Sequence, residues 1–244
     1  MVSWSWLLVA AAALLGGIAQ TVTGFGSGIV MASILPYAFG MLQAPALSSA
    51  ISLLLSATLA FRYRENIDWR AVLVPAALYI AASVTIIHLV RRMNLRVLGA
   101  VFGLFLILLC VYYLFGENRF PMPGGRTMLV VCSVVSGLTG GLFGIGGPLM
   151  ALYFLERTDS REAYMADLQM LFLVTGASGL IARIANGIYT VDLILPTVLG
   201  VAAISLGRVA GNVVAERLDA GTLKRAIYIF VGLSGLVTLV KQLG

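Results

Sequence analysis

Two glycine-rich stretches contain the residues whose types and spacing could bind a ligand. The first is GFGSG at residues 24–28, and the second is GIGGP at residues 144–148. Glycine costs a helix about 1 kcal/mol relative to alanine, and proline costs about 3 kcal/mol, so each stretch is expected to interrupt a helix. A short helix is predicted after each break, from Ile29 to about Phe39 and from Leu149 to about Leu155. Pro148 suits the first helical position, which needs no N–H donor.

The chemistry that such breaks predict is the binding of a small anion. The first N–H groups of a helix have no partner within it, and the helix dipole places positive charge there. The alternative is that the glycines only let helices pack closely, since GLTGGLFG at 137–144 has small residues at four-residue spacing. Two matching breaks, each followed by a short helix, favour binding. The candidate residues of the breaks are Gly24, Gly26, Ser27, Gly28, Gly144, Gly146, Gly147 and Pro148.

Polar side chains near the breaks are further candidates. Some directly precede the first break, others follow it in the next apolar segment, and one amide lies about two turns into the segment after the second break. These residues are Gln20, Thr21, Thr23, Ser48, Ser49, Ser52 and Gln169. Gln20, Thr23, Ser49 and Gln169 are predicted to line the anion site, with hydrogen bonding between helices as the alternative.

Arg208 is the charge placed most deeply in an apolar segment. It lies nine residues before Arg217, which is roughly 13 Å along a helix. Charges within a membrane usually face a bundle interior or a cavity. Arg208 is therefore predicted to bind the anion; the alternatives are pairing with Asp192 or Glu216, or extension to the membrane surface.

Enzyme, metal and cofactor chemistry are not expected. The chain has one histidine, His88, and its two cysteines, Cys110 and Cys132, fall in apolar runs, so a metal site lacks ligands. The sequence contains no usable Ser/His/Asp set and no Walker glycine loop followed by lysine. The net charge of +6 does not indicate nucleic-acid binding, because the basic residues lie at the ends of apolar runs.

The composition is that of an integral membrane protein. Of the 244 residues, 60% are hydrophobic and only 11% are charged, and the mean hydropathy is +1.01. Soluble domains carry about 25% charged residues. Apolar runs of suitable length for spanning helices cover 69–90, 97–115, 163–182 and 191–207. The N-terminus has no basic region before its apolar run and resembles a retained first helix more than a signal peptide.

The sequence indicates two halves with corresponding features in the same order. After each glycine break comes an apolar helix (46–61 and 163–182), a polar turn (64–70 and 186–192) and a second long helix. Asp68 and Asp192 are predicted to cap these second helices. A further polar segment and a final apolar helix then follow in both halves. The predicted repeats are residues 1–116 and 128–244, joined by a cytoplasmic linker at 117–127.

Basic residues favour a hairpin at each break. If each broken segment crossed the membrane once, Lys and Arg (Arg208 aside) would divide seven to eight between the two faces. If each turns back, the division is ten to five, as the positive-inside rule favours. The ten are Arg62, Arg64, Arg70, Arg119, Arg126, Arg157, Arg161, Arg217, Lys224 and Arg225, and the five are Arg91, Arg92, Arg96, Arg183 and Lys241. A hairpin plus three crossings inverts the second half and leaves both termini periplasmic.

These features resemble those of the sulfite exporter TauE/SafE family over essentially the whole chain. The resemblance rests on GFGSGIVMASILP (24–36) and GLFGIGGPLMALYF (141–154), and on the turns RYRENIDWR (62–70) and NGIYTVD (186–192). It implies a bacterial inner-membrane permease that exports sulfite or an organosulfonate. It also singles out Gly24, Gly26, Gly28, Gly144, Gly146, Gly147 and Pro148 as the two motifs. Ser27 stands where the second copy has Gly147, and Gly28 stands where it has Pro148.

The expected fold is an all-α polytopic membrane protein of two inverted repeats, each a Gly-broken helical hairpin plus three transmembrane helices, with 8–10 membrane segments. The expected function is export of a small sulfur-containing anion by alternating access. A passive anion channel, a non-transporting membrane scaffold and a metal transporter are the alternatives. The expected partners are the anion and membrane lipid, with a homodimer left open.

Overall fold

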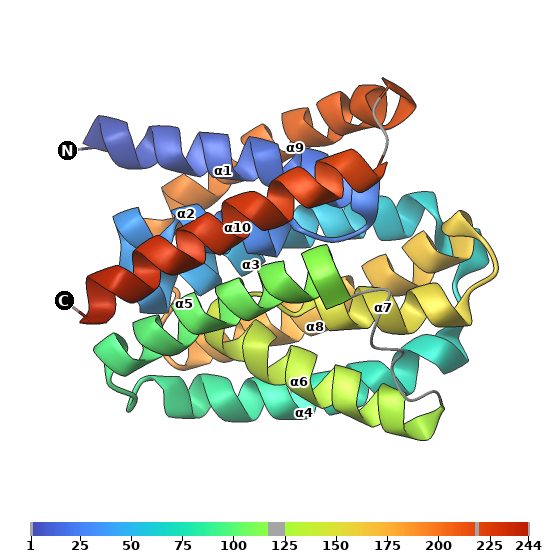
Figure 1. Ribbon diagram of the computed structural model, residues 1–244, viewed down its shortest axis with the longest axis horizontal. Coiled ribbons are helices and arrows are strands. Elements are labelled where there is room, and N and C mark those ends of the chain that lie inside the picture. The colour runs from blue at the N-terminus through green and yellow to red at the C-terminus, as the bar shows by residue number, and fades with distance from the viewer. Residues whose placement is uncertain (1, 117–124, 218–219, 244) are drawn as a thin grey trace.

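The computed structural model describes residues 2–116, 125–217 and 220–243, and every regular element in these ranges is a helix (Figure 1). Among the described residues, six helices are long and apolar enough to cross a membrane. They are α1 (Val2–Thr23), α3 (Pro36–Arg62), α4 (Trp69–Val90), α6 (Arg126–Phe143), α8 (Arg161–Ala185) and α9 (Ile194–Arg217). α5 (Leu95–Val111) and α10 (Ala220–Leu243) contain shorter apolar stretches. The protein is thus an all-α polytopic membrane protein, as its composition predicts.

The first glycine stretch ends α1 and starts a short helix. Gly24 (φ 85°) and Gly26 (φ 113°) have left-handed backbone conformations, which favour glycine. α2 (Ser27–Ile34) follows, and its helical path continues into the first turn of α3 until Gly40 (φ 71°, ψ 172°) breaks it. Pro36 interrupts only the hydrogen-bond ladder, because it has no N–H. The predicted end of the short helix at Phe39 therefore agrees with the structure.

The second glycine stretch ends α6 and starts α7 (Gly147–Arg157), with Pro148 as its second residue. Gly144 is left-handed (φ 73°), like Gly24, but Gly146 has φ −113° where Gly26 has φ 113°. The two breaks therefore have different backbone geometry despite their similar sequences.

Each break turns the chain back on itself. A Cβ atom on Gly16, in α1, would lie 3.1 Å from the Cα atom of Ser27, so α2 starts beside α1 rather than beyond its end. The start of α6 and the end of α7 lie at one end of the bundle (right in Figure 1). The start of α1, the end of α10 and the α4–α5 turn lie at the other. This arrangement agrees with the hairpin interpretation of both broken segments.

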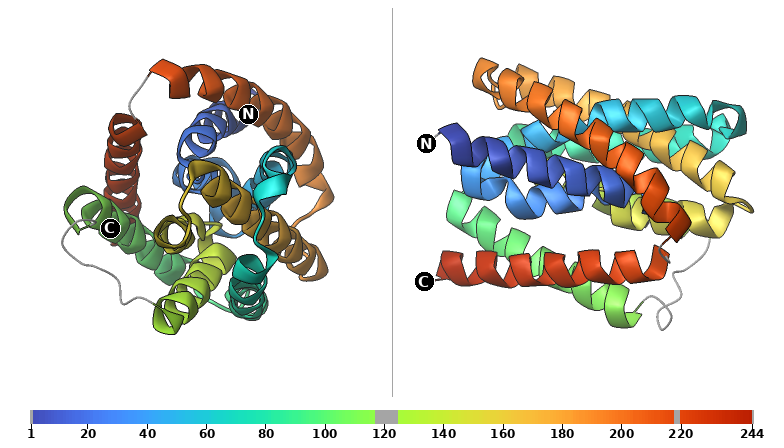
Figure 2. Two further views of the ribbon diagram at one scale, coloured as in Figure 1. Left: turned by 90° about the vertical axis from the view of Figure 1, so that its right-hand side faces the viewer. Right: turned by 90° about the horizontal axis from the view of Figure 1, so that it is seen from above.

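The long helices pack mainly across the two halves of the chain. α1 packs on α9, α4 on α6, α3 on α8, and α5 on α10. Figure 2 shows the resulting bundle from its end and from above. Glycines at several of these contacts allow close approach, for example Gly17 against Gly207 and Gly103 against Gly235.

Two details of the turns differ between the halves. Asp68 caps α4 as predicted, since its carboxylate accepts hydrogen bonds from the N–H groups of Arg70 (2.9 Å) and Ala71 (3.3 Å). The prediction for Asp192 was wrong: it lies within a 3₁₀ turn, Val191–Leu193, and α9 begins at Ile194. This turn buries Leu193 and leaves Asp192 exposed.

Of the predicted linker, 117–124 lies outside the described residues, whereas Arg126 and Thr127 already belong to α6.

Candidate functional site

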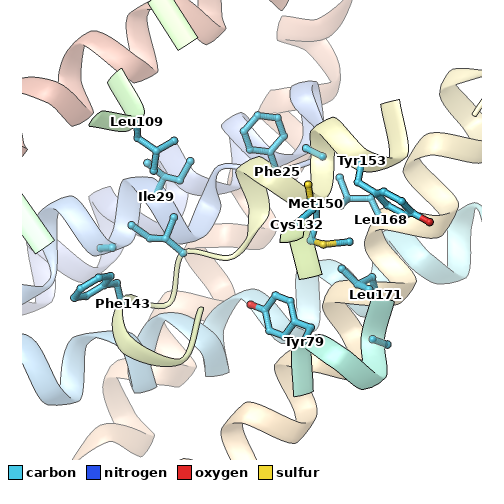
Figure 3. Close-up of a cluster of buried hydrophobic side chains, with 14 of the residues drawn as sticks. Phe25, Ile29, Tyr79, Leu109, Cys132, Phe143, Met150, Tyr153, Leu168 and Leu171 are labelled. Carbon is cyan, nitrogen blue, oxygen red and sulfur yellow. The ribbon is translucent and has the colours of Figure 1, made fainter. Parts of the chain in front are cut away.

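The two glycine breaks meet in the middle of the bundle. Gly28 lies directly against the carbonyl oxygen of Gly144, and a Cβ atom on Gly28 would overlap that oxygen. A Cβ atom on Gly147 would lie 3.2 Å from the Cβ atom of Phe25. Figure 3 shows Phe25, in the first break, and Phe143, the residue directly before the second break, in one cluster of buried hydrophobic residues. Residues far apart in the sequence therefore form one site.

A cavity of about 90 Å³ lies where the breaks meet. One water needs roughly 10–15 Å³ by the same measure, so the cavity has room for several waters or for one small ion. Its walls come from both breaks and from α1, α3, α4, α6 and α8. The lining residues are Gln20, Gly26, Ser27, Gly28, Ile29, Ser48, Ser49, Ser52, Leu53, Ser56, Tyr79, Ser83, Gly140, Gly144, Ile145, Gly146, Gly147, Phe172, Thr175, Gly176, Gly179 and Arg183.

The starts of α2 and α7 supply backbone donors to this cavity. Gly26, Ser27 and Gly28 line it from α2, and Gly146 and Gly147 line it from α7. Within the described residues, no side chain caps either helix start. The N–H groups of Ser27 and Gly28 in α2 and of Gly147 in α7 also have no backbone acceptor among the described residues, whereas Pro148 has no N–H. Both helix dipoles direct positive charge toward the cavity.

Hydroxyl groups of α3 form one wall. Ser48, Ser52 and Ser56 recur every four residues and so share a face of the helix. The Ser52 hydroxyl lies 3.0 Å from that of Ser27, and Ser56 accepts a hydrogen bond from Gln20 at 3.0 Å. The Ser48 hydroxyl has no partner in the described part of the chain. This wall can donate to or accept from a ligand.

Gln20 joins four helices behind the first break. Its Nε2 donates to the Ser56 hydroxyl and, at 2.8 Å, to Oε1 of Gln169, while its Oε1 accepts from the Ser27 hydroxyl. Nε2 of Gln169 in turn donates to the carbonyl of Gly24. Both amides are fully buried. They satisfy polar groups that the break would otherwise leave unpaired inside the membrane.

α8 also binds the broken ends of α1 and α6. The Tyr164 hydroxyl donates to the carbonyl of Thr23 at 3.1 Å, at the last residue of α1. Nη2 of Arg183 donates to the carbonyls of Gly140 (3.0 Å) and Gly141 (2.9 Å), in the last turn of α6. The last carbonyls of a helix lack the usual intrahelical donors. The Gly140 carbonyl also accepts from the N–H of Gly144 at 3.0 Å, and α8 supplies side-chain donors for both helices that end inside the membrane.

Arg183 is only 3% exposed. Among the described residues that line the cavity, it is the only charged one. The site therefore combines two helix starts, a row of hydroxyls and one guanidinium, with no carboxylate in its lining. This set of groups favours a small anion over a cation.

The sequence profile of the sulfite exporter TauE/SafE family matches residues 9–238. The chain belongs to this family. It is also 28% identical over 163 residues to a probable sulfite/organosulfonate exporter TauE from Cupriavidus necator. That match covers 64% of this chain and 63% of the relative, so it spans less than two thirds of the relative's length. No solved structure matches the chain. The TauE/SafE resemblance is thus confirmed: the chain is a multi-pass membrane protein and belongs to a family of exporters, which is not a class of enzymes.

In this TauE/SafE protein, most of the predicted site residues line the cavity. Those that do are Gln20, Gly26, Ser27, Gly28, Ser49, Gly144, Gly146 and Gly147. Thr23, Gly24, Pro148 and Gln169 lie outside the lining but next to it in the breaks or in the amide network. Thr23, for instance, donates to the carbonyl of Phe25 and so shapes the first break. Ser48 and Ser52, also considered from the sequence, line the cavity as well.

Arg208 does not line the cavity. It lies on α9, which packs on the outer side of α1, and its side chain is partly exposed. In the described part of the chain Arg208 has no ion-pair partner, and the side chain of Glu216 lies outside the described residues.

Sequence reasoning missed Arg183, which it assigned to the end of a span. A signal was present, since Phe172, Gly176, Gly179 and Arg183 recur every three or four residues and so share one face of α8. It also missed Tyr79, whose hydroxyl lies against Gly140 and Gly146. Within the described residues, no group of three His, Cys, Asp or Glu side chains could hold a metal ion.

Proposed function

We propose that this TauE/SafE protein exports a small sulfur-containing anion, sulfite or an organosulfonate, across the bacterial inner membrane by alternating access. The anion would bind in the cavity between the breaks, held by the first N–H groups of α2 and α7 and by the hydroxyls of α3. The observation that carries this proposal is the convergence of two half-helix starts on one cavity whose lining has a guanidinium and no carboxylate.

The helix contacts support two repeats related by a pseudo-two-fold axis. If α1 corresponds to α6 and α4 to α9, exchanging the halves converts the α1–α9 pair into the α6–α4 pair. The α3–α8 and α5–α10 pairs each convert into themselves. We therefore retain residues 1–116 and 128–244 as inverted repeats that would rock about the central site.

Export of an anion is already favoured when the cell interior is negative, so coupling to protons is possible but not required. Moving one charge across 100 mV is worth about 2.3 kcal/mol. The ten basic residues assigned to one face would place that face in the cytoplasm and both termini in the periplasm.

Ligand-induced stabilisation of the purified protein tests this proposal. Sulfite, sulfate, thiosulfate and organosulfonates would be compared by thermal unfolding, with sodium and potassium chloride as salt controls. Stabilisation by a sulfur oxyanion above the salt controls is expected. Stabilisation by a cation alone would exclude an anion site. Saturable counterflow of the stabilising anion in liposomes would then exclude a passive channel and a scaffold.

A further inference from the structure

We propose that Arg183 is the side chain that recognises the transported anion, and that it connects the anion to the end of α6. This inference rests on the proposed function of the cavity and assigns a specificity-determining residue to it. One nitrogen of the guanidinium holds α6, and the remaining N–H groups are available to the anion.

Only one of the three guanidinium nitrogens of Arg183 is paired within the described part of the chain. Nη2 donates to the carbonyls of Gly140 and Gly141. Within the described residues, Nη1 and Nε have no acceptor. A side chain that is 3% exposed therefore keeps unpaired donors.

Nη1 of Arg183 lies beside Gly179, which lines the cavity. A Cβ atom on Gly179, one turn earlier in α8, would lie 3.2 Å from Nη1. Gly179 lines the cavity, as does Arg183. The glycine thus leaves room for Nη1 on the face of α8 that borders the cavity.

The positive charge of Arg183 has no acidic partner in the described lining of the cavity. Carbonyl groups carry only partial negative charge, and none of the described residues that line the cavity is acidic. An uncompensated guanidinium inside a membrane is costly. An anion in the cavity would supply the missing charge, and a guanidinium fork fits the paired oxygens of an oxyanion better than it fits a halide.

The consequence is a direct link between ligand and helix. Gly140 and Gly141 form the last turn of α6, immediately before the Gly144–Gly146 break. An anion on Nη1 would thus share one guanidinium with the end of α6. Lysine could not replace arginine here, because one ammonium group cannot hold two carbonyls and present a fork to an oxyanion.

The test compares sulfite binding by the full chain in detergent, measured by titration calorimetry and thermal shift. The variants are Arg183→Gln and Arg183→Lys, with Arg126→Gln, an exposed residue at the start of α6, as the charge-matched control. Affinity for sulfite is expected to fall at least tenfold in both Arg183 variants and to remain within twofold in the control. The preference for sulfite over chloride is expected to fall in Arg183→Lys.

Gly179→Ala keeps the test informative if the Arg183 variants do not fold. Alanine favours the helix, so this variant is expected to fold at least as well as the wild type while its methyl group crowds Nη1. Its sulfite affinity is expected to fall several-fold. If the wild type binds sulfite and Gly179→Ala and any folded Arg183 variant bind it equally well, the role of Arg183 is wrong and the proposed function stands. If no sulfur anion binds the wild type, the proposed function itself is wrong.

Discussion

Gly28 lies directly against the carbonyl oxygen of Gly144, so the two glycine breaks touch with no side chain between them. This contact brings the starts of α2 and α7 to the same cavity. The φ of Gly28 is not in the left-handed region, so its backbone conformation does not explain why this residue is glycine. Its role is therefore to let two backbones approach, which distinguishes it from Gly24, Gly26 and Gly144.

Gly28→Ala is expected to destabilise the protein. Its methyl group would overlap a backbone oxygen, and overpacking of this kind costs about 1–3 kcal/mol. The melting temperature in detergent should fall by several degrees. Gly176→Ala is the matched control for stability, because its Cβ atom would meet only Cδ1 of Leu53 at 3.4 Å. Equal melting temperatures for the two variants would contradict the close contact between the breaks.

A second prediction concerns Tyr79 and Gly146. A Cβ atom on Gly146 would overlap the Tyr79 hydroxyl, whereas the φ of Gly146, −113°, suits any residue. Gly146→Ala should therefore be destabilising in the wild type but nearly neutral in a Tyr79→Leu background, which lacks the overlapping ring atoms. A double-mutant cycle of melting temperatures measures this coupling.

Gly144→Ala provides the contrast for that cycle. Its Cβ atom would have room, the nearest atom being 3.5 Å away in Pro45, but its φ of 73° disfavours alanine. Tyr79→Leu should not rescue it. If Tyr79→Leu restores the melting temperature of both glycine variants, or of neither, the Tyr79 side chain is not the reason that residue 146 must be glycine.

The positions of the breaks could be predicted from sequence because glycine and proline act locally. Helix propensity and helix capping depend on neighbouring residues alone, so the ends of α1 and α6 and the start of α7 were found within a few residues. The cap at Asp68 follows from the same local rules. The predicted cap at Asp192 was wrong because the burial of Leu193, a tertiary effect, determines the turn there.

Arg183 and Arg208 show what local reasoning cannot supply. Counting residues from the end of a span places Arg208 deeper than Arg183, but depth does not determine which face of a helix borders the cavity. α8 passes both breaks, whereas α9 packs on α1 at the outside of the site. That difference depends on which helices of the two halves pair, and no local pattern encodes it.

Arg208→Gln is accordingly expected to keep the stabilisation by sulfite that the wild type shows. Arg208 lies outside the cavity lining, so removal of its charge leaves the bound anion unchanged. The shift in melting temperature on adding sulfite should agree with that of the wild type. Loss of the sulfite-induced shift in melting temperature in Arg208→Gln would show that Arg208 takes part in binding the anion.

The amide network behind the first break gives another prediction. Gln20→Leu would remove one hydrogen bond from each of the hydroxyls of Ser27 and Ser56 and from Oε1 of Gln169. Ser27 would keep Ser52 as a partner, and Nε2 of Gln169 would keep the Gly24 carbonyl. Unpaired buried polar groups cost about 1–3 kcal/mol each in water-soluble proteins, and interhelical bonds in membranes average about 0.6 kcal/mol. A loss of about 1–3 kcal/mol in total is expected, seen as a lower melting temperature.

Thr21→Val is the control for Gln20→Leu. Thr21 is also buried in α1, but its hydroxyl donates only to the carbonyl of Gly17 in the same helix, at 2.7 Å. A small effect is expected for it. If Thr21→Val destabilises the protein as much as Gln20→Leu does, the network that joins α1, α2, α3 and α8 contributes no particular stability.

The orientation in the membrane can be tested with single cysteines. Cys110 and Cys132 are free thiols, and serine at both positions gives a background for Asn66→Cys and Met93→Cys, which replace exposed residues in turns at opposite ends of the bundle. The turn that contains Asn66 lies among the ten basic residues assigned to the cytoplasm. A membrane-impermeant maleimide should therefore label Met93→Cys in spheroplasts and should label Asn66→Cys only after lysis. α4 connects these two turns across the membrane, so they report opposite faces. The opposite labelling pattern would therefore show that the proposed orientation is reversed.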